Sequence, residues 1–165
     1  MLDLKIVCKE DKYKPEYANS TDACMDLKIV IDEEAFIPDR WLDNINYHSK
    51  ANECWLFPGE KRLFGTGIQV AIPEDYVMLL YPRSSTGSKL SIMLANTTGV
   101  IDTGYRDEVK LCLVNYSSTP VKLEDGQRIA QFMIIARPKL NLHLVEDDEE
   151  FRNGDRGGGF GSTGA

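Results

Sequence analysis

The stretch PRSSTGSK (82–89) gathers several groups that bind anions within a few residues. Arg83 offers a guanidinium group, three serines and a threonine offer hydroxyls, and Lys89 adds a second cation. Together with successive backbone N–H groups, these suit phosphate oxygens. The stretch is not a Walker A motif, because that pattern requires a glycine where Pro82 stands. A solvated β-turn explains the same composition, so both interpretations stand on this stretch alone.

Two other stretches carry candidate functional groups. An apolar run, GVI (99–101), leads directly to Asp102, and a strand–turn–strand with a carboxylate at its inner end can activate a water. An aspartate that caps a hairpin turn is the plainer interpretation. Gln131 lies inside the apolar run of DGQRIAQFMI (125–134), where a buried amide needs a hydrogen-bond partner.

The sequence finishes on DRGGGFGSTGA (155–165). Gly159, Gly161 and Gly164 match the GxGxxG dinucleotide fingerprint, but the context predicts neither the preceding strand nor the following helix that this motif requires. A disordered terminus is the plain interpretation. Any function of the stretch must therefore belong to another kind of site.

The elements that position these groups are predicted to be strands. Apolar and polar residues alternate in LDLKIVC (2–8), EVKLCLV (108–114) and KLNLHLV (139–145), and turn signals separate many short β-rich runs. This pattern predicts an all-β sandwich or barrel. A helix is expected only in residues 33–45, where Pro38 interrupts or begins it.

Composition narrows the class of protein. A chain of 165 residues is predicted to form one domain. A net charge of −7 argues against nonspecific nucleic-acid binding. No apolar run reaches a membrane span and the first ten residues lack a signal-peptide layout, so a soluble, cytoplasmic protein is expected. The scattered cysteines predict free, buried thiols, and the two distant histidines give no zinc-site spacing.

In this order, five motifs together resemble those of the trimeric deoxyuridine triphosphatase (dUTPase) family. They are DACMDLKI (22–29), PRSSTGSK (82–89), GVIDTGYRDE (99–108), GQRIAQFMI (126–134) and RGGGFGSTG (156–164). The resemblance implies a distorted jelly-roll β-barrel with little helix, and a homotrimer with three active sites at subunit interfaces. It implies hydrolysis of dUTP to dUMP and pyrophosphate with Mg2+, without nucleic-acid or membrane partners.

The resemblance also implies a domain organisation. Residues 1–145 would form the barrel with motifs one to four, interrupted by an inserted segment at about 33–56. Residues 146–165 would form a flexible C-terminal arm with motif five. Extended, the fifteen residues from Glu146 to Phe160 span about 50 Å, enough to reach a neighbouring subunit. The arm would act as a lid that orders over bound nucleotide.

The resemblance assigns roles to individual residues. Asp102 would be the catalytic residue that activates the water attacking the α-phosphorus in line, and Asp26 would lie near the metal through a water. Tyr105 would stack on the deoxyribose, and Phe160 would cover the uracil. The implied substrate-binding residues are Arg83, Ser84, Ser85, Asn96, Gly99, Val100, Ile101, Tyr105, Lys110, Gln131, Arg156, Phe160, Gly161 and Ser162.

Within that set, the resemblance assigns different residues to different parts of the nucleotide. Asn96 and the backbone of residues 99–101 would read the uracil edge inside a tight hairpin. Arg83, the two serines after it and Gln131 would hold the phosphates. The arginine, glycine and serine of the fifth motif would close on the β- and γ-phosphates.

This sequence departs from the family pattern in several places. Cys24 and Asp107 stand where glycine is usual. The spacing from Arg156 to Phe160 is one residue short, which leaves Arg152 as an alternative for the fifth-motif arginine. The chain between the first and second motifs is long, and its segment 33–56 is either a passive surface excursion or a partner-binding lobe.

Two functions of different classes follow from the sequence. The first is a dUTP diphosphatase, which the retained Asp102 favours. The second is a dUTP-sensing interaction protein on the same scaffold, acting through residues 33–56. Deamination of dCTP on a related scaffold is disfavoured, because the uracil-type hairpin and the glycine-rich tail fit the hydrolase better.

Overall fold

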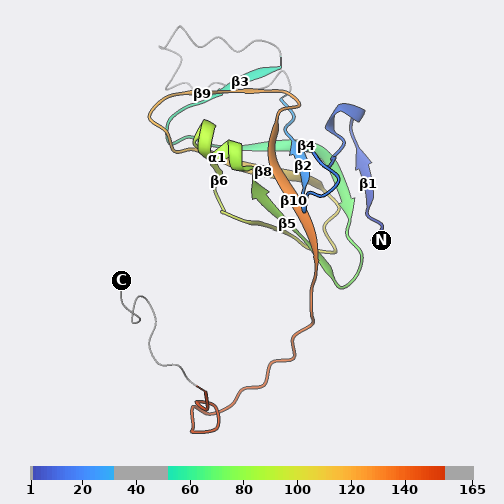
Figure 1. The fold of residues 1–165 in the computed structure, drawn as a ribbon, viewed down its shortest axis with the longest axis vertical. Coiled ribbons are helices and arrows are strands. Elements are labelled where there is room, and N and C mark those ends of the chain that lie inside the picture. The colour runs from blue at the N-terminus through green and yellow to red at the C-terminus, as the bar shows by residue number, and fades with distance from the viewer. Residues whose placement is uncertain (1, 32–51, 155–165) are drawn as a thin grey trace.

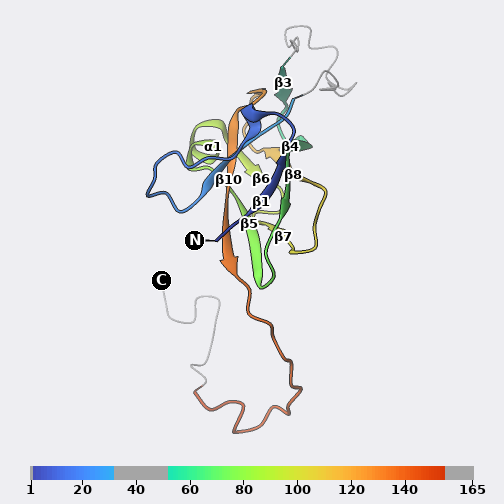
Figure 2. The same cartoon turned by 90° about the vertical axis from the view of Figure 1, so that its right-hand side faces the viewer.

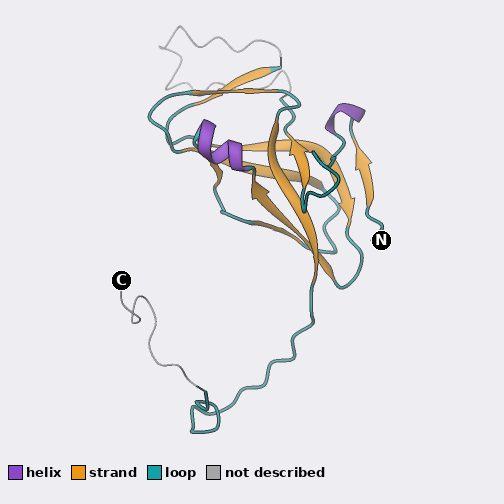
Figure 3. Ribbon diagram, viewed as in Figure 1, coloured by secondary structure: helices purple, strands orange, loops and turns teal. Residues whose placement is uncertain are grey.

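The computed structural model describes residues 2–31 and 52–154, which are mostly strand (Figures 1 and 3). The helices are the 3-10 turn η1 (Asp11–Tyr13) and α1 (Ser84–Leu90). The strands are β1 (Lys5–Cys8), β2 (Met25–Lys28), β3 (Glu53–Leu56), β4 (Lys61–Ala71), β5 (Tyr76–Pro82), β6 (Ile92–Leu94), β7 (Gly99–Ile101), β8 (Glu108–Asn115), β9 (Val121–Glu124) and β10 (Arg128–Ala136). The predicted all-β class is confirmed. No helix in the described ranges is long and apolar enough to cross a membrane.

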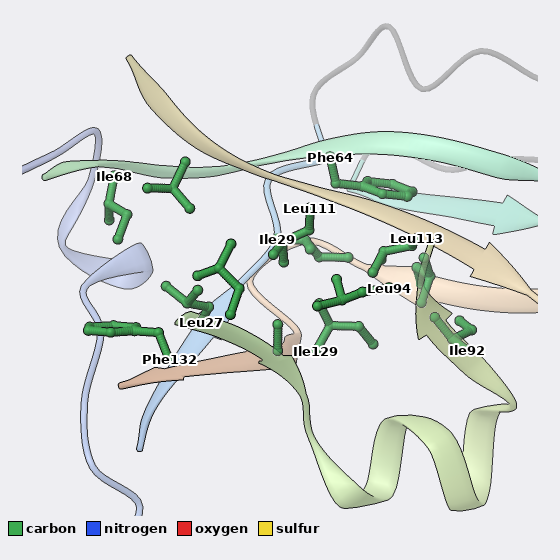
Figure 4. Packing of buried hydrophobic residues seen from close by; sticks show 14 of the residues in the cluster. Leu27, Ile29, Phe64, Ile68, Ile92, Leu94, Leu111, Leu113, Ile129 and Phe132 are labelled. Atoms are coloured by element: carbon green, nitrogen blue, oxygen red, sulfur yellow. The ribbon is translucent and has the colours of Figure 1, made fainter. Parts of the chain in front are cut away.

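Two antiparallel four-stranded sheets enclose one core. Their strand orders are β1-β4-β8-β6 and β2-β10-β5-β7, and a two-stranded sheet, β3-β9, lies at one end (Figure 2). Side chains from both four-stranded sheets interdigitate between them, as Leu27, Leu111 and Ile129 do in Figure 4. On β8 the apolar residues predicted to face inward are fully buried, and each such leucine contributes about 2 kcal/mol to stability.

The alternating stretch 139–145 was expected to be a strand, and this prediction is wrong for the single chain. Its backbone forms no strand after β10, and Leu140, Leu142 and Leu144 are 81, 85 and 101% exposed. Figures 1 and 2 both show the chain leaving the barrel at this point. A strand needs a neighbour for its backbone N–H and C=O groups, and this segment has left the sheet that could supply one.

The only described α-helix, α1, lies where no helix was predicted, while the expected helix at 33–45 lies outside the described residues. Glycine and serine are poor helix formers, so tertiary contacts select this helix. The buried Thr86 hydroxyl donates to the carbonyl of Ile129 at 2.7 Å. Ser91 ends the helix in a left-handed conformation, with φ 52° and its N–H on Gly87 O.

The sequence also led to the expectation of hairpin turns on both sides of residues 99–101, and this prediction is wrong. Within the described chain, β6 pairs with β8, β7 pairs with β5, and β8 pairs with β4 and β6. Residues 95–98 and 102–107 are therefore turns that cross between the two four-stranded sheets. Each flanking strand finds its hydrogen-bond partner in a different sheet, so the turns join sheets rather than adjacent strands.

The last residues of the segment predicted to be an insertion, 33–56, belong to the barrel. Glu53–Leu56 form β3, and Cys54 and Leu56 are fully buried against the core. All four cysteines are unpaired, as expected, although Cys54 alone is buried. Burial raises the pKa of the Cys54 thiol to about 11, which keeps it protonated at neutral pH.

Candidate functional site

A buried carboxylate on β2 organises one end of the second sheet. Asp26 is 5% exposed; its Oδ1 forms an ion pair with Arg83 Nε at 2.7 Å, and its Oδ2 accepts a hydrogen bond from Arg128 Nη1 at 3.1 Å. An unpaired buried charge costs several kcal/mol, and two guanidiniums offset that cost. Asp26 therefore holds two arginines, one that caps the start of α1 and one at the start of β10.

Gln131 joins this cluster through the register of the sheet. It stands directly opposite Asp26 on β2 and opposite Tyr81 on β5. Residues directly opposite in an antiparallel pair share a face, so Gln131 and Asp26 point to the same side. The Gln131 amide Nε2 donates to the carbonyl of Pro82 at 3.1 Å, which supplies the hydrogen-bond partner that the sequence required.

Beside this cluster lies a cleft of about 320 Å³, which we call the basic cleft. It is lined by Arg83, Ser85, Thr86, Lys89, Leu90, Gln127 and Arg128. Three of these side chains are cations and none is a carboxylate, so the lining favours an anion. Ser84, on the first turn of α1, is exposed beside the cleft.

Sequence reasoning predicted Arg83 and Ser85 as cleft residues but did not commit to Lys89, Gln127 or Arg128. Lys89 was visible as a cation of the same motif. Arg128 lies three residues before Gln131, and alternation along a strand assigns two such residues to opposite faces. No simple spacing rule therefore predicts that Arg128 and Gln131 lie on the same face.

The structure does not bring Asp102 to the basic cleft within one chain. On β5, Met78 stands opposite Ile101 and Leu80 opposite Gly99. Asp102 follows one residue beyond this register, near the start of β5, whereas Arg83 follows its end. At about 3.3 Å per residue the two positions lie about 20 Å apart along the strand. Asp102 itself is exposed to solvent.

The backbone before Asp102 is tightly fixed. A Cβ added to Gly99 would lie 2.9 Å from the Leu80 Cδ1 atom, so a larger residue here would have to displace the Leu80 side chain. Val100 is 59% exposed on the opposite side of the strand. Asn96 is exposed in the preceding turn, where its carbonyl accepts the Thr98 N–H at 2.6 Å.

The turn 102–107 holds Tyr105 in place. The Tyr105 hydroxyl donates to Glu108 O at 2.7 Å, and its N–H donates to Asp102 O at 3.1 Å. Burial, reinforced by the carboxylates of residues 107 and 108, raises the pKa of the Tyr105 hydroxyl. Asp107 and Cys24, which replace the usual glycines, do not adopt positive φ, so neither departure strains the backbone.

The remaining predicted residues lie elsewhere. Lys110 is exposed on β8 opposite Gly65, in the sheet that does not carry the basic cleft. Arg156, Phe160, Gly161 and Ser162 lie outside the described residues. Arg152, the alternative for the fifth-motif arginine, is exposed and pairs with Asp147.

The described residues provide no complete metal site of their own. In the ranges 2–31 and 52–154, no cluster of three or more His, Cys, Asp or Glu side chains is placed to hold a metal ion. Mg2+ usually binds through one or two carboxylates, several waters and substrate phosphates. Asp26 beside an anion-binding cleft fits that arrangement only if the phosphates supply most of the ligands.

Comparison with known proteins points to one family. A family model described as dUTPase matches residues 48–164. The deoxyuridine 5'-triphosphate nucleotidohydrolase of Clostridium acetobutylicum is 40% identical over 141 residues, covering 81% of this chain and 92% of that protein.

Solved structures with a similar fold are also named dUTPases. A single-residue mutant of Staphylococcus bacteriophage 80alpha dUTPase with dUpNHpp superposes with a TM-score of 0.75 at 25% identity, over 100% of both chains. A mutant dUTPase from phage phi11 of S. aureus, described with a structural Mg(II) ion, superposes with a TM-score of 0.68. At 23% identity, over 90% of this chain and 99% of that one, this second likeness shows the fold alone.

Proposed function

The chain belongs to the dUTPase family, and on that premise we propose that it is a dUTP diphosphatase that hydrolyses dUTP to dUMP and pyrophosphate. The observation that supports the proposal is the ion pair between Asp26 and Arg83, with Gln131 opposite Asp26 in the sheet. Three of the family's motifs supply these residues, and Arg83 lines the basic cleft.

In the proposed mechanism the basic cleft binds the triphosphate. Arg83, Ser85 and Gln131 contact phosphate oxygens, and Ser84 contributes from the adjacent exposed turn. Asp102 accepts a proton from the water that attacks the α-phosphorus in line with the pyrophosphate leaving group. Bound Mg2+ would offset the charge that develops on the pyrophosphate, and Asp26 would contact it through a water.

The chain between residues 96 and 105 is proposed to select the base and sugar. The backbone of Gly99–Ile101 and the Asn96 amide bind the uracil edge, while Tyr105 stacks on the deoxyribose. The fixed position of Gly99 against Leu80 supports this role, because a rigid polar edge rejects bases that leave its groups unpaired. Lys110 is a less supported member of the set, since it lies in the other sheet.

The separation of about 20 Å between Asp102 and Arg83 supports a site built by more than one subunit. A general base must lie within hydrogen-bond reach of its water, so the Asp102 of one chain cannot serve that chain's own cleft. A homotrimer with sites between subunits resolves the separation. The exposed leucines at 140, 142 and 144 support the same assembly, since such a patch marks an interface.

The C-terminal arm is proposed as a lid supplied by a neighbouring subunit. The chain after β10 leaves the barrel (Figure 1). Arg156, Gly161 and Ser162 would close on the β- and γ-phosphates, and Phe160 would cover the uracil. We also propose the cytoplasm as the location, and a domain of residues 1–145 in which the strands of the single chain end with β10 at Ala136.

The sensor alternative, acting through residues 33–56, is not favoured, because the relatives that match this chain are named nucleotidohydrolases. A protein partner of that segment remains a separate proposal. Since β3 belongs to the core, a separable lobe would have to lie before Glu53.

Pyrophosphate release from dUTP, with dCTP and dTTP as competing substrates, tests the proposed function. We expect turnover of dUTP alone and a loss of about a hundredfold or more in kcat for Asp102→Asn. Asp107→Asn is the matched control, because it removes an exposed charge from the same turn. No turnover of dUTP, or an unchanged rate in Asp102→Asn, would refute the proposal.

A further inference from the structure

The turn between β9 and β10 forms one wall of the basic cleft. Residues 124–127 form a β-turn that is closed by the Gln127 N–H, which donates to Glu124 O at 3.0 Å, and Gly126 has φ 72°. A positive φ at the third position of such a turn favours glycine. Gln127 and Arg128, the two residues after this glycine, both line the cleft. The position of the turn therefore decides where this wall lies.

The regular ladder of β10 begins beyond this turn. The register of β10 against β2 shifts between Arg128 and Ala130. Such a shift is a β-bulge, which interrupts the ladder and bends the strand. On the near side of the bulge, the Gly126 N–H donates to Ile29 O at 2.9 Å and the Ile29 N–H donates to Gln127 O at 3.1 Å. The cleft wall thus lies outside the regular ladder, and side-chain contacts have to complete its support.

A buried carboxylate in the same turn supplies that support. The side chain of Asp125 is 7% exposed. Its Oδ1 accepts hydrogen bonds from the Ile31 N–H at 2.8 Å and from the Tyr13 hydroxyl at 2.9 Å, and its Oδ2 forms an ion pair with Lys12 Nζ at 2.9 Å. The Asp125 N–H donates to Asn52 O at 2.9 Å. One residue of the turn is therefore tied to η1, to the chain after β2 and to the chain before β3.

The Tyr13 side chain that binds this carboxylate is itself held in place. It is 2% exposed, and a Cβ added to Gly67 would lie 2.8 Å from its Cδ2 atom, so the ring packs directly on the β4 backbone. The same backbone is anchored to the N-terminal chain, because the Lys9 N–H donates to Gly67 O at 2.7 Å. The hydroxyl therefore comes from a fixed point on the other four-stranded sheet.

The chain that follows the turn is joined to α1. The Ile129 carbonyl accepts hydrogen bonds from the Thr86 hydroxyl at 2.7 Å and from the Arg83 N–H at 3.4 Å. Arg83 and Thr86 also line the cleft, whereas Asp125 is not among its lining residues. A shift of the turn would therefore move residues on both sides of the cleft. Asp125 acts on the cleft through these residues and not by contact with a ligand.

We propose that Asp125, bound by the Tyr13 hydroxyl and Lys12, is a positioning residue that holds the turn 124–128 so that the basic cleft keeps its shape for a polyphosphate. This rests on the proposed function in one respect, that the polyphosphate is the triphosphate of dUTP. An apolar side chain could fill the same space, but it would leave the buried Ile31 N–H unpaired and would not set the direction of the turn.

Calorimetric titration with inorganic tripolyphosphate in EDTA tests the inference without metal or turnover. Asp125→Asn loses the ion pair with Lys12, and we expect it to weaken tripolyphosphate binding about three- to tenfold. Asp125→Ala loses every side-chain contact and should weaken binding up to about thirtyfold. Tyr13→Phe removes one hydroxyl but keeps the packing on Gly67, so it should weaken binding about threefold and still fold.

Glu60→Gln is the matched control. Glu60 is also a buried carboxylate of a turn, 4% exposed, and it accepts a backbone N–H at 2.8 Å and pairs with Arg62. Its turn follows Leu56, which lies at the other end of the β3–β9 ladder from Glu124, and Glu60 does not line the cleft. We expect Glu60→Gln to lower the melting temperature, as Asp125→Asn does, but to leave tripolyphosphate binding within about twofold of the parent.

Deoxyuridine binding separates positioning of the cleft from loosening of the whole fold. Deoxyuridine carries no phosphate, so its affinity should not change in Asp125→Asn or Tyr13→Phe, whereas a loosened fold would bind both ligands more weakly. In the double variant Asp125→Ala/Tyr13→Phe, tripolyphosphate binding should be no weaker than in Asp125→Ala alone, because the Tyr13 hydroxyl acts through the carboxylate.

Tripolyphosphate binding to Asp125→Ala and Tyr13→Phe within about twofold of the parent would overturn the inference. An equal loss in Glu60→Gln, an equal loss of deoxyuridine binding, or a parent protein that does not bind tripolyphosphate would overturn it too. If Asp125→Ala does not fold, Tyr13→Phe decides alone. Failure of the proposed function is distinguishable: a protein that does not hydrolyse dUTP yet loses tripolyphosphate binding in Tyr13→Phe keeps the inference and loses the enzyme.

Discussion

Two inactive variants of this chain should restore each other's activity when they are mixed. Asp102 and Arg83 lie about 20 Å apart along β5, so the proposed site takes Asp102 from one subunit and Arg83 from another. Asp102→Asn and Arg83→Gln each destroy every site in their own homotrimers. In a mixed trimer, a site that combines the intact Asp102 of one variant with the intact Arg83 of the other is functional.

Random assembly fixes the expected size of the recovery. In an equal mixture the chance that both contributing subunits carry the intact residue is one half for each, so about a quarter of the sites should work in a closed symmetric ring. The variants are unfolded together, refolded at a 1:1 ratio and assayed for pyrophosphate release. We expect about a quarter of the parent rate, against the residual rate of each variant refolded alone.

Asp102→Asn refolded with the double variant Asp102→Asn/Arg83→Gln is the control. Its trimers contain no intact Asp102 and should stay inactive, which excludes recovery through refolding alone. A 1:1 mixture of the single variants that is no more active than the mean of its components would refute the subunit-bridging site. It would require Asp102 to reach the cleft of its own chain.

Three other perturbations follow from the structure. Gly99→Ala places a Cβ 2.9 Å from a Leu80 side-chain carbon, so we expect the free energy of unfolding, measured in urea, to fall by about 1–3 kcal/mol. Gly104→Ala is the control and should lower it less, because a Cβ there meets nothing within 4 Å. Burial alone would raise the pKa of Asp125, but hydrogen bonds from the Ile31 N–H, Lys12 and Tyr13 outweigh it and lower that pKa below 3.8. This carboxylate therefore contributes stability above pH 3.8 that is lost as the pH falls further, and Asp125→Asn should flatten the acid limb of the melting temperature against pH. Truncation after Glu150 removes residues 151–165 of the arm and should abolish most dUTP turnover while leaving the melting temperature nearly unchanged; full activity would exclude the lid.

The strands could be predicted where one sheet face is buried within the chain. Alternation in β8 identified Leu111 and Leu113 as core residues, and both are about 1% exposed. The same alternation at 139–145 led to the wrong prediction of a strand within the chain. An alternating pattern indicates that one face is apolar, but it does not say which chain covers that face. The α1 helix was missed for a related reason: Thr86 and Ile129 are 43 residues apart, and only the folded chain shows their contact.

The chemistry of the candidate site could be predicted from the sequence, but the relative positions of its residues could not. The motifs pointed to Arg83, Ser85 and Gln131 as phosphate-binding residues; Arg83 and Ser85 line the basic cleft, and the Gln131 amide donates to the carbonyl of Pro82, the residue before Arg83. Arg128 was missed because a bulge changes the face that a strand residue occupies, and bulges leave little trace in a single sequence. The separation of Asp102 from Arg83 depends on the register of β5 and β7, which no local pattern encodes.

The position of β5 explains why a single chain cannot close this site by itself. The strand runs between β10 and β7 and is hydrogen-bonded to both, so bending it would break backbone hydrogen bonds on two sides. Arg83 follows its last residue and Asp102 lies beside its start, so the strand separates the proposed phosphate-binding group from the proposed water-activating group. We infer that hydrolysis is a property of the assembled protein, and that activity per chain should fall on dilution at the concentration where the assembly dissociates.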